Sequence, residues 1–243
     1  MTLSAPVELI AGADSTDLDT YVTASGSPAE NTLLTLFVVG GHLTAAASAD
    51  AVAGMGIFWT RIADIVSTSN VLGGAIFTAL STGTAGALTI EFPTVQSNAA
   101  WILVGQVDGV VEQFTEKTAG TSPTTITLTD TPSAGSRSFG FMANNGAAQV
   151  LTPTSPAVAV GAGTQPSGAS PPTRLSAIYA DGQQTLGWTS NNSTKVVFAV
   201  ELSEDSPPPE NPVRGRWNGS EIVPGSFIGR GPTLIPGSII GVT

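Results

Sequence analysis

The feature that most constrains the fold is a series of short apolar runs, each bounded by Gly, Ser, Pro or Asn. The runs are rich in Val, Ile, Thr, Phe and Trp, a composition typical of β-strands. No pattern of strands alternating with helices is present, which argues against a doubly wound nucleotide-binding fold. The expected strands are Leu33–Val39, Gly56–Ile62, Gly74–Leu80, Ala87–Phe92, Ala100–Val107, Thr124–Leu128, Ser136–Met142, Arg174–Tyr179, Gln184–Trp188 and Lys195–Leu202.

Alternation within these runs favours antiparallel sheets that have one solvated face. In Thr125–Leu128, for example, threonine alternates with an apolar residue. Short strands with frequent turn residues predict an all-β fold, an antiparallel β-sandwich of the jelly-roll type, over residues 1–205.

Four connections between the expected strands have a recognisable composition. Asp181-Gly182 predicts a hairpin turn, and Asn191–Thr194 is expected to join the last two strands. Pro153–Pro172 is rich in Pro, Ser, Gly and Ala, and it predicts a long exposed loop between sheets. The alanine-rich stretch Leu43–Ala53 is compatible with a short helix or with a loop.

The composition changes after residue 205. Ser206–Pro212 predicts a stiff, extended linker because four of its residues are proline. Residues 213–243 contain a repeat of twelve residues, in which Gly219–Arg230 is followed by the similar Gly231–Val242. Each unit has two apolar pairs separated by Pro-Gly-Ser and predicts a strand, a turn and a strand. Two such units cannot bury their apolar side chains alone, so this β-repeat appendage is expected to bind the sandwich, a sister subunit or another protein.

Charge and composition exclude several classes of protein. The net charge of −10 repels phosphate, so no nucleic-acid partner is expected. The chain has no cysteine, which excludes disulfides and Cys-bound zinc. The N-terminal residues lack the pattern of a signal peptide, and no apolar run is long enough to predict membrane insertion.

The residues that could carry chemistry do not form a recognisable motif. His42 is the sole histidine, and no G-x-S-x-G motif accompanies it, so a packing or surface role is expected. Asp14, Asp17 and Asp19 are oxygen ligands of the kind calcium prefers, but their spacing is not that of an EF-hand; a structural calcium ion near Asp14–Asp19 stays an open alternative to solvated carboxylates. No spacing singles out a glycosidase pair among Asp64, Glu91, Asp108, Glu112 and Glu116. We therefore predict no enzyme, no cofactor, and no catalytic, cofactor-binding or metal-binding residue.

The aromatic residues are expected to pack in the core rather than to bind a ligand. Trp59 and Trp101 lie within apolar runs and are expected in the core. Tyr179–Gly182 and Trp188–Asn192 would offer rings beside Asn and Asp if their strands paired, an arrangement suited to a sugar. Ordinary strand-end and loop residues are the expected interpretation of both segments.

Two parts of the chain resemble phage proteins. Arg216–Pro224 (Arg-Trp-Asn-Gly-Ser-Glu-Ile-Val-Pro) resembles the W-D-G-S-x-x-V-P units that end minor tail proteins of phages infecting actinobacteria. Asn218 stands where Asp is more usual, and the second repeat unit lacks the Trp. Pro28–Leu34, Gly54–Trp59 and Ala100–Val107 are similar to a β-sandwich domain of phage virion proteins.

The resemblance implies a non-enzymatic structural component of a phage particle, expected to be a minor tail or tail-tip protein that contributes to assembly and host-surface adhesion. Its expected location is the virion, assembled in the host cytoplasm. Its expected partners are other virion proteins and copies of itself in a homo-oligomer, with a host cell-surface glycan as a further candidate. A capsid-surface decoration or head-fibre protein and a carbohydrate-binding module remain alternatives.

Overall fold

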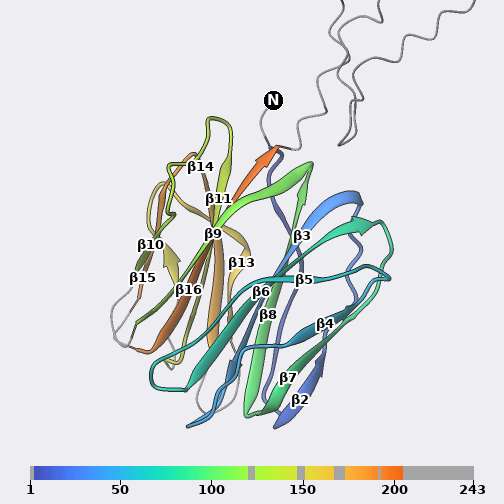
Figure 1. The fold of residues 1–243 in the computed structure, drawn as a ribbon, viewed down its shortest axis with the longest axis vertical. Helices are drawn as coiled ribbons and strands as arrows, with labels where there is room; N and C mark the ends of the chain where they lie inside the picture. Colours follow the sequence, from blue (N-terminus) through green and yellow to red (C-terminus); the bar gives the residue numbers. More distant parts are fainter. Residues whose placement is uncertain (1–2, 120–123, 147–150, 167–172, 191–192, 205–243) are drawn as a thin grey trace, which may run out of the picture. The chain divides into compact units, whose positions relative to one another are not determined.

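The described part of the chain is built entirely from strands. The computed structural model describes residues 3–119, 124–146, 151–166, 173–190 and 193–204 (Figure 1). This part contains sixteen strands and no helix, so the prediction of an all-β fold is confirmed. The predicted linker 206–212 and the repeat segment 213–243 lie outside the described residues, and the predictions for them stay predictions.

The first eight strands form two antiparallel sheets. The five-stranded sheet, which we term the inner sheet of the first half, has the order β1-β8-β3-β6-β5. The three-stranded sheet, termed the outer sheet, has the order β2-β7-β4. The strands are β1 (Val7–Asp14), β2 (Leu18–Val22), β3 (Glu30–Gly41), β4 (Ala51–Gly54), β5 (Thr60–Val66), β6 (Leu72–Thr82), β7 (Leu88–Gln96) and β8 (Asn98–Val107).

The next eight strands repeat this order. The inner sheet of the second half is β9-β16-β11-β14-β13, and its outer sheet is β10-β15-β12. Adding eight to each strand number of the first half therefore gives the second half. The strands are β9 (Gly109–Ala119), β10 (Thr125–Thr127), β11 (Arg137–Asn144), β12 (Thr152–Pro153), β13 (Val158–Pro166), β14 (Arg174–Asp181), β15 (Thr185–Thr189) and β16 (Lys195–Glu204).

Each half has the strand order of a jelly roll. The chain crosses between the inner and the outer sheet at every connection except the one between the fifth and sixth strands of each half. Only Asp108 joins β8 to β9, and its positive φ of 55° turns the chain from the first inner sheet into the second. The predicted jelly-roll sandwich over residues 1–205 is thus a tandem of two such units.

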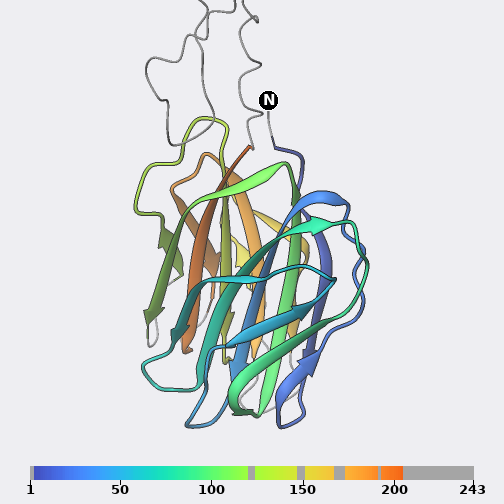
Figure 2. The same cartoon turned by 45° about the vertical axis from the view of Figure 1, so that its right-hand side comes forward.

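The sheets stack in the order outer, inner, inner, outer, with a separate apolar core in each of the three gaps. The central core combines side chains of both inner sheets, including Phe37 and Ile102 of the first half and Phe141 and Phe198 of the second. The other two cores each lie between the inner and outer sheet of one half. After a 45° turn, the orange and yellow strands of the second half lie behind the blue and green strands of the first (Figure 2).

This layering explains the two sequence patterns among the strands. The central strands of the inner sheets are covered on both faces, and sequences such as Leu33–Val39 are therefore almost continuously apolar. The strands of the outer sheets have one exposed face, so Thr125 and Thr127 flank the buried Ile126. The predicted pattern of one solvated face is thus found in the outer sheets and not in the central strands of the inner sheets.

The two inner sheets also protect each other's edges. The edge strand β5 lies next to β9, and the edge strand β1 lies next to β13. An exposed edge strand invites pairing with other chains, so this arrangement removes the four longest edges from that risk. The remaining edge strands, β2, β4, β10 and β12, are at most five residues long.

A buried arginine joins the two halves. Arg137 of β11 donates to the Asp181 carboxylate at 2.6 Å, to Gln106 Oε1 of β8 at 3.1 Å and to the backbone carbonyl of Ser4. Its guanidinium also lies 4.8 Å from the ring centre of Tyr179. One side chain therefore ties the N-terminal segment and an inner strand of the first half to two inner strands of the second.

A buried carboxylate fastens a connection of the second half. Glu201 of β16 accepts hydrogen bonds from Gln113 Nε2 at 2.6 Å and from the backbone N–H of Ser133 at 2.8 Å. Burial by itself raises the pKa of Glu201, but hydrogen bonds from Gln113, Ser136 and Ser133 outweigh it and hold the pKa below its usual value. The carboxylate form of Glu201 therefore stabilises the folded protein.

Replacing Glu201 with Gln is expected to lower the free energy of unfolding at pH 7 by about 2 kcal/mol, because an amide cannot accept all of these bonds. Because the folded-state pKa is depressed, the contribution of Glu201 is present above the unfolded-state value of about 4.3 and is lost as pH falls through the folded-state pKa. Urea unfolding at pH 7 and at pH 3 measures this difference. A gap between wild type and variant that does not narrow on acidification would contradict the assignment.

The structure corrects several predictions about local structure. The ten predicted strands all overlap observed ones, but β1, β2, β4, β9, β12 and β13 were not predicted. The predicted loop Pro153–Pro172 is wrong in part, because it contains β13 and the end of β12. Leu43–Ala53 contains no helix and runs into β4. Asp181-Gly182 does turn the chain, with Gly182 at φ 61°, but β14 and β15 lie in different sheets and form no hairpin.

Candidate functional site

The antiparallel topology gives the described residues two distinct ends. The terminal end is the one at which β1 begins and β16 finishes; the distal end is the opposite one (Figure 1). Odd-numbered strands run toward the distal end and even-numbered strands run away from it. The first residues of β14 and β16 and the last residues of β11 therefore meet at the distal end of the second half.

Cationic side chains are distributed unevenly between these ends. Five of the eight Lys and Arg residues precede Ser206. Arg61 lies 3.3 Å from Asp50, and Arg137 lies 2.6 Å from Asp181. The other three belong to one inner sheet, at the distal end of the second half, and they are Lys117 of β9, Arg174 of β14 and Lys195 of β16.

The strand register places Arg174, Asn144 and Lys195 in one row. Asn144 of β11 is paired with Arg174 on one side and with Lys195 on the other. Directly paired residues of antiparallel strands project to the same face of the sheet, with their Cβ atoms about 5 Å apart. Met142 and Val197, each two residues further along its strand, lie in the core between the inner and outer sheets. The row therefore lies at the distal end of that sandwich, on the face toward the outer sheet.

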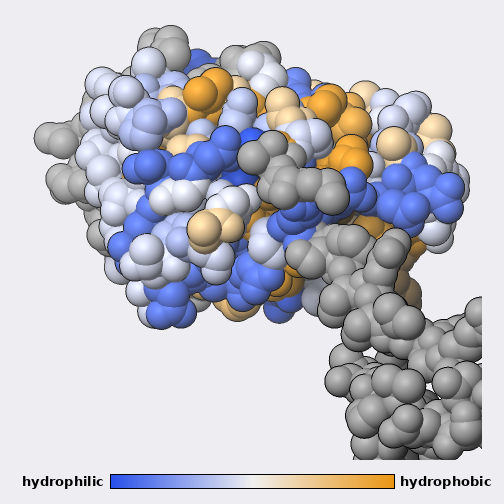
Figure 3. All heavy atoms as spheres, turned by 90° about the horizontal axis from the view of Figure 1, so that it is seen from above, coloured by the Kyte–Doolittle hydropathy of each residue, from blue (hydrophilic) through white to orange (hydrophobic). Residues whose placement is uncertain are grey.

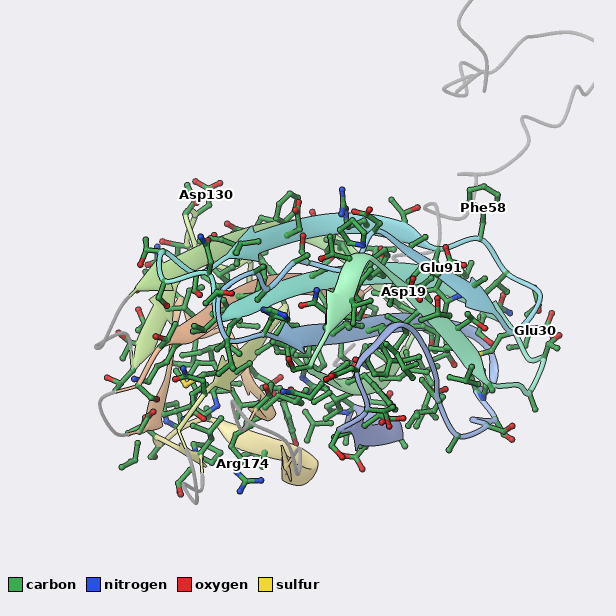
Figure 4. The ribbon with its side chains drawn as sticks, turned by 90° about the horizontal axis from the view of Figure 1, so that it is seen from below. Asp19, Glu30, Phe58, Glu91, Asp130 and Arg174 are labelled. Carbon is green, nitrogen blue, oxygen red and sulfur yellow. The ribbon has the colours of Figure 1, made fainter. Side chains whose placement is uncertain are left out.

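Two members of the row are fully buried and one reaches solvent. Asn144 and Lys195 are both 0% exposed. Lys195 Nζ donates to the backbone carbonyl of Ser193 at 3.1 Å, and burial lowers the pKa of Lys195. Arg174 is half-buried, and in the view from the distal end it lies at the side of the molecule with its guanidinium directed outward (Figure 4).

Three polar atoms beside this row have no hydrogen-bond partner. They are Oδ1 and Nδ2 of Asn144 and Oγ of Ser193, all of them buried. A buried polar group without a partner costs about 1–3 kcal/mol, so folded proteins rarely retain one without a reason. Among the described residues, three of the five such atoms belong to Asn144 and Ser193, at the distal end of the second half.

The row of Arg174, Asn144 and Lys195 lies among strand ends that lack acidic residues. The described residues of the strand ends that meet here, 117–119, 124–125, 144–146, 151–152, 173–174, 189–190 and 193–195, include no Asp or Glu, although the whole chain carries 18. A negatively charged group is therefore favoured here even though the protein as a whole is strongly anionic.

His42 has a local structural role. It lies just after β3, and its Nδ1 accepts hydrogen bonds from the backbone N–H groups of Thr44 and Ala45 at 3.2 and 3.0 Å. With Nδ1 used in this way, the ring orders the connection toward β4. This geometry matches the expected packing or surface role.

The three carboxylates near the N-terminus act electrostatically on Tyr21. Asp14 is the last residue of β1, Asp17 lies in the turn, and Asp19 is in β2. Burial raises the pKa of Tyr21 to about 12, and the three carboxylates contribute to this rise. The Tyr21 hydroxyl donates to the carbonyls of Thr16 and Gln96. Across the described ranges, no group of three or more His, Asp and Glu residues is arranged to hold a metal ion.

The carboxylates considered for glycoside hydrolysis lie on β5, on β7, in the link between the halves and on β9. Asp64 lies in β5, where its Oδ2 accepts from Ser48 at 3.1 Å, and Glu91 is exposed on β7 of the outer sheet. Asp108 forms the link between the halves, and Glu112 accepts a hydrogen bond from Ser203. The side chain of Glu116 lies outside the described residues.

The aromatic residues considered for sugar binding do not come together. Trp188 is 2% exposed and belongs to the core between inner and outer sheets, where its Nε1 donates to Ser176 Oγ at 3.2 Å. Tyr179 packs against the central core on the opposite face of the inner sheet. Trp59 and Trp101 are buried in the core of the first half, which confirms the prediction that both are core residues.

Sequence reasoning missed Asn144, Arg174 and Lys195 as a group. A usable signal was present, because Lys and Arg are scarce and two of the few stand at strand starts within acid-free segments. Their convergence depends on the strand register, which the sequence does not display.

Comparison with known proteins gives no match. No protein-family model, no curated protein and no solved structure matches this chain. The described part of the chain also contains no helix with the length and apolarity required to cross a membrane.

Proposed function

We propose that the chain is a non-enzymatic structural component of a bacteriophage particle, a minor tail or tail-tip protein that contributes to assembly and host-surface adhesion. The likeness of Arg216–Pro224 to the repeats of phage tail proteins supports this class of particle. Jelly rolls are a common architecture of viral capsid and lectin domains, so two in tandem suit a particle protein that contacts a surface.

The observation that carries the proposal is the different character of the two ends. At the terminal end, apolar surface lies among polar residues (Figure 3), as expected where neighbouring proteins bind. Its exposed large apolar side chains are Val7, Val22, Phe58, Leu80, Val107 and Val158. The distal end of the second half instead carries the polar row of Arg174, Asn144 and Lys195. This division supports the proposal of attachment at one end and adhesion at the other.

Immunogold labelling of purified particles from the phage that encodes the chain tests the proposal. Label is expected at the tail or tail tip, and particles made with a chain truncated after Asp205 are expected to lose it if the C-terminal repeat is the assembly element. Label on the capsid would favour the capsid-surface alternative. Particles that carry no label with the full-length chain would contradict the virion role.

A further inference from the structure

We propose that the chain binds a second copy of itself by exchanging halves, with Asp108 as the hinge and the terminal ends of the two copies in contact. In the exchanged dimer, the first half of each chain packs against the second half of the other. The inference deepens the proposed attachment at the terminal end by naming its partner, and it rests on that function for its biological meaning.

The two inner sheets contact each other in a reciprocal way. The first strand of each half lies next to the fifth strand of the other, as β1 lies next to β13 and β5 next to β9. The same reciprocity holds nearer the centre, where β8 contacts β14 and β6 contacts β16. Mutual contacts of this kind define an approximate two-fold relation, which is the symmetry of a homodimer interface. Each half therefore packs against a face of the same kind as its own.

The contacts of this central core do not depend on which chain supplies them. Phe37 of the first half packs against Phe141 and Phe198 of the second, and Arg137 of the second half donates to Gln106 of the first. The same contacts form when the second half belongs to another copy, because only the covalent link differs. Exchange of halves therefore keeps every side-chain contact of the central core.

One residue separates the closed chain from the exchanged one. Asp108 alone joins β8 to β9, and its φ of 55° lies in the left-handed region, which is disfavoured for a residue that has a Cβ atom. If Asp108 took an extended conformation, β9 would continue in the direction of β8, and the second half would separate from the first. A short hinge under strain favours domain swapping.

The surface beside the hinge suits the new contact. β8 finishes and β9 begins at the terminal end, so an opened hinge carries the second half beyond that end. Two exchanged chains therefore stack with their terminal ends facing each other. Val7, Val107 and Val158 are exposed at this end, where apolar surface gathers (Figure 3). Their burial occurs only in the dimer and offsets part of the entropy lost when two chains associate.

Size-exclusion chromatography with light scattering tests the exchange on the full-length chain, refolded from urea at several protein concentrations. Wild type is expected to be monomeric at the lowest concentration and to form a rising fraction of dimer at higher ones. Asp108→Val is expected to strengthen the dimer by about tenfold or more, because a β-branched residue is strongly disfavoured at positive φ. Asp108→Gly removes the same charge but tolerates positive φ, and it is expected to weaken the dimer by about tenfold.

A second measurement separates exchange from the docking of closed copies. An exchanged dimer dissociates only after its halves separate from each other, so the isolated dimer is expected to persist through dilution and a second chromatographic run. Unfolding in urea and refolding at low concentration is expected to convert it to monomer. Closed copies that dock through their terminal ends would instead dissociate as soon as they are diluted.

Several outcomes would overturn the inference. They are a monomer at every concentration in wild type and in Asp108→Val, a dimer that forms equally in both hinge variants, or a dimer that dissociates at once on dilution. If Asp108→Val fails to fold, a wild type that stays monomeric at every concentration is decisive by itself. Labelled particles built from a chain that stays monomeric would remove the exchange and leave the particle role. Exchanged dimers of a chain absent from particles would remove the particle role and leave the exchange.

Discussion

Replacing Phe37 with Ala is expected to lower the free energy of unfolding by about 4 kcal/mol. Phe37 is fully buried on β3 in the core between the two inner sheets. Its ring centre lies 5.5 Å from that of Phe141 and 5.3 Å from that of Phe198, both of which belong to the second half. The substitution therefore removes aromatic contacts that join the halves and leaves a cavity between two sheets that cannot close on it.

The matched control is Phe58→Ala, because Phe58 is 93% exposed in the connection between β4 and β5. The same chemical change there is expected to alter the free energy of unfolding by less than about 0.5 kcal/mol. Urea unfolding followed by tryptophan fluorescence measures both variants. Equal effects of the two substitutions would mean that the inner sheets do not pack through Phe37.

The same experiment reports whether the halves unfold together. Both halves contribute side chains to one central core, and Arg137 adds polar contacts across it, so a single cooperative transition is expected for wild type. Weakening this core by Phe37→Ala is expected to lower the midpoint of that transition. Two transitions in wild type would contradict a shared core.

Sequence reasoning located the strands that are buried on both faces. The runs Leu33–Val39 and Lys195–Leu202 are long, apolar and rich in β-branched residues, so pattern and structure agree. The unpredicted strands lack this signal for identifiable reasons. β9 carries several charged residues at a sheet edge, and β13 includes two glycines and ends in a proline. Their strand structure comes from pairing with β16 and β14, which composition does not reveal.

The tandem arrangement is invisible in the amino-acid sequence. The repeat that the sequence displays lies in Gly219–Val242, whereas the repeat that organises the body is one of strand order. Many different sequences can adopt the same strand order, because a buried position requires only an apolar side chain of suitable size. The candidate site has the same origin, since its residues become neighbours only through the register of β14, β11 and β16.

Replacing Trp101 with Ala is also expected to lower the free energy of unfolding by about 4 kcal/mol. Trp101 of β8 is 4% exposed in the core between the inner and outer sheets of the first half, and its ring centre lies 6.3 Å from that of Tyr21. The paired residue on β1 is Gly12, where an added Cβ would lie 3.0 Å from the indole Nε1. The absence of a side chain at Gly12 therefore makes room for the ring.

Trp101→Phe separates the packing of the ring from its polar atom. The indole Nε1 is buried without a hydrogen-bond partner, so the wild-type residue already carries the cost of one unpaired donor. Phenylalanine removes that donor and keeps an aromatic ring, and the loss of stability is expected to be about 1 kcal/mol or less. Urea unfolding of both variants measures the difference. If Trp101→Phe lowers the free energy of unfolding as much as Trp101→Ala, the shape of the indole rather than its apolar area holds the two sheets of the first half together. If Trp101→Ala lowers it by less than about 1 kcal/mol, Trp101 is not a core residue.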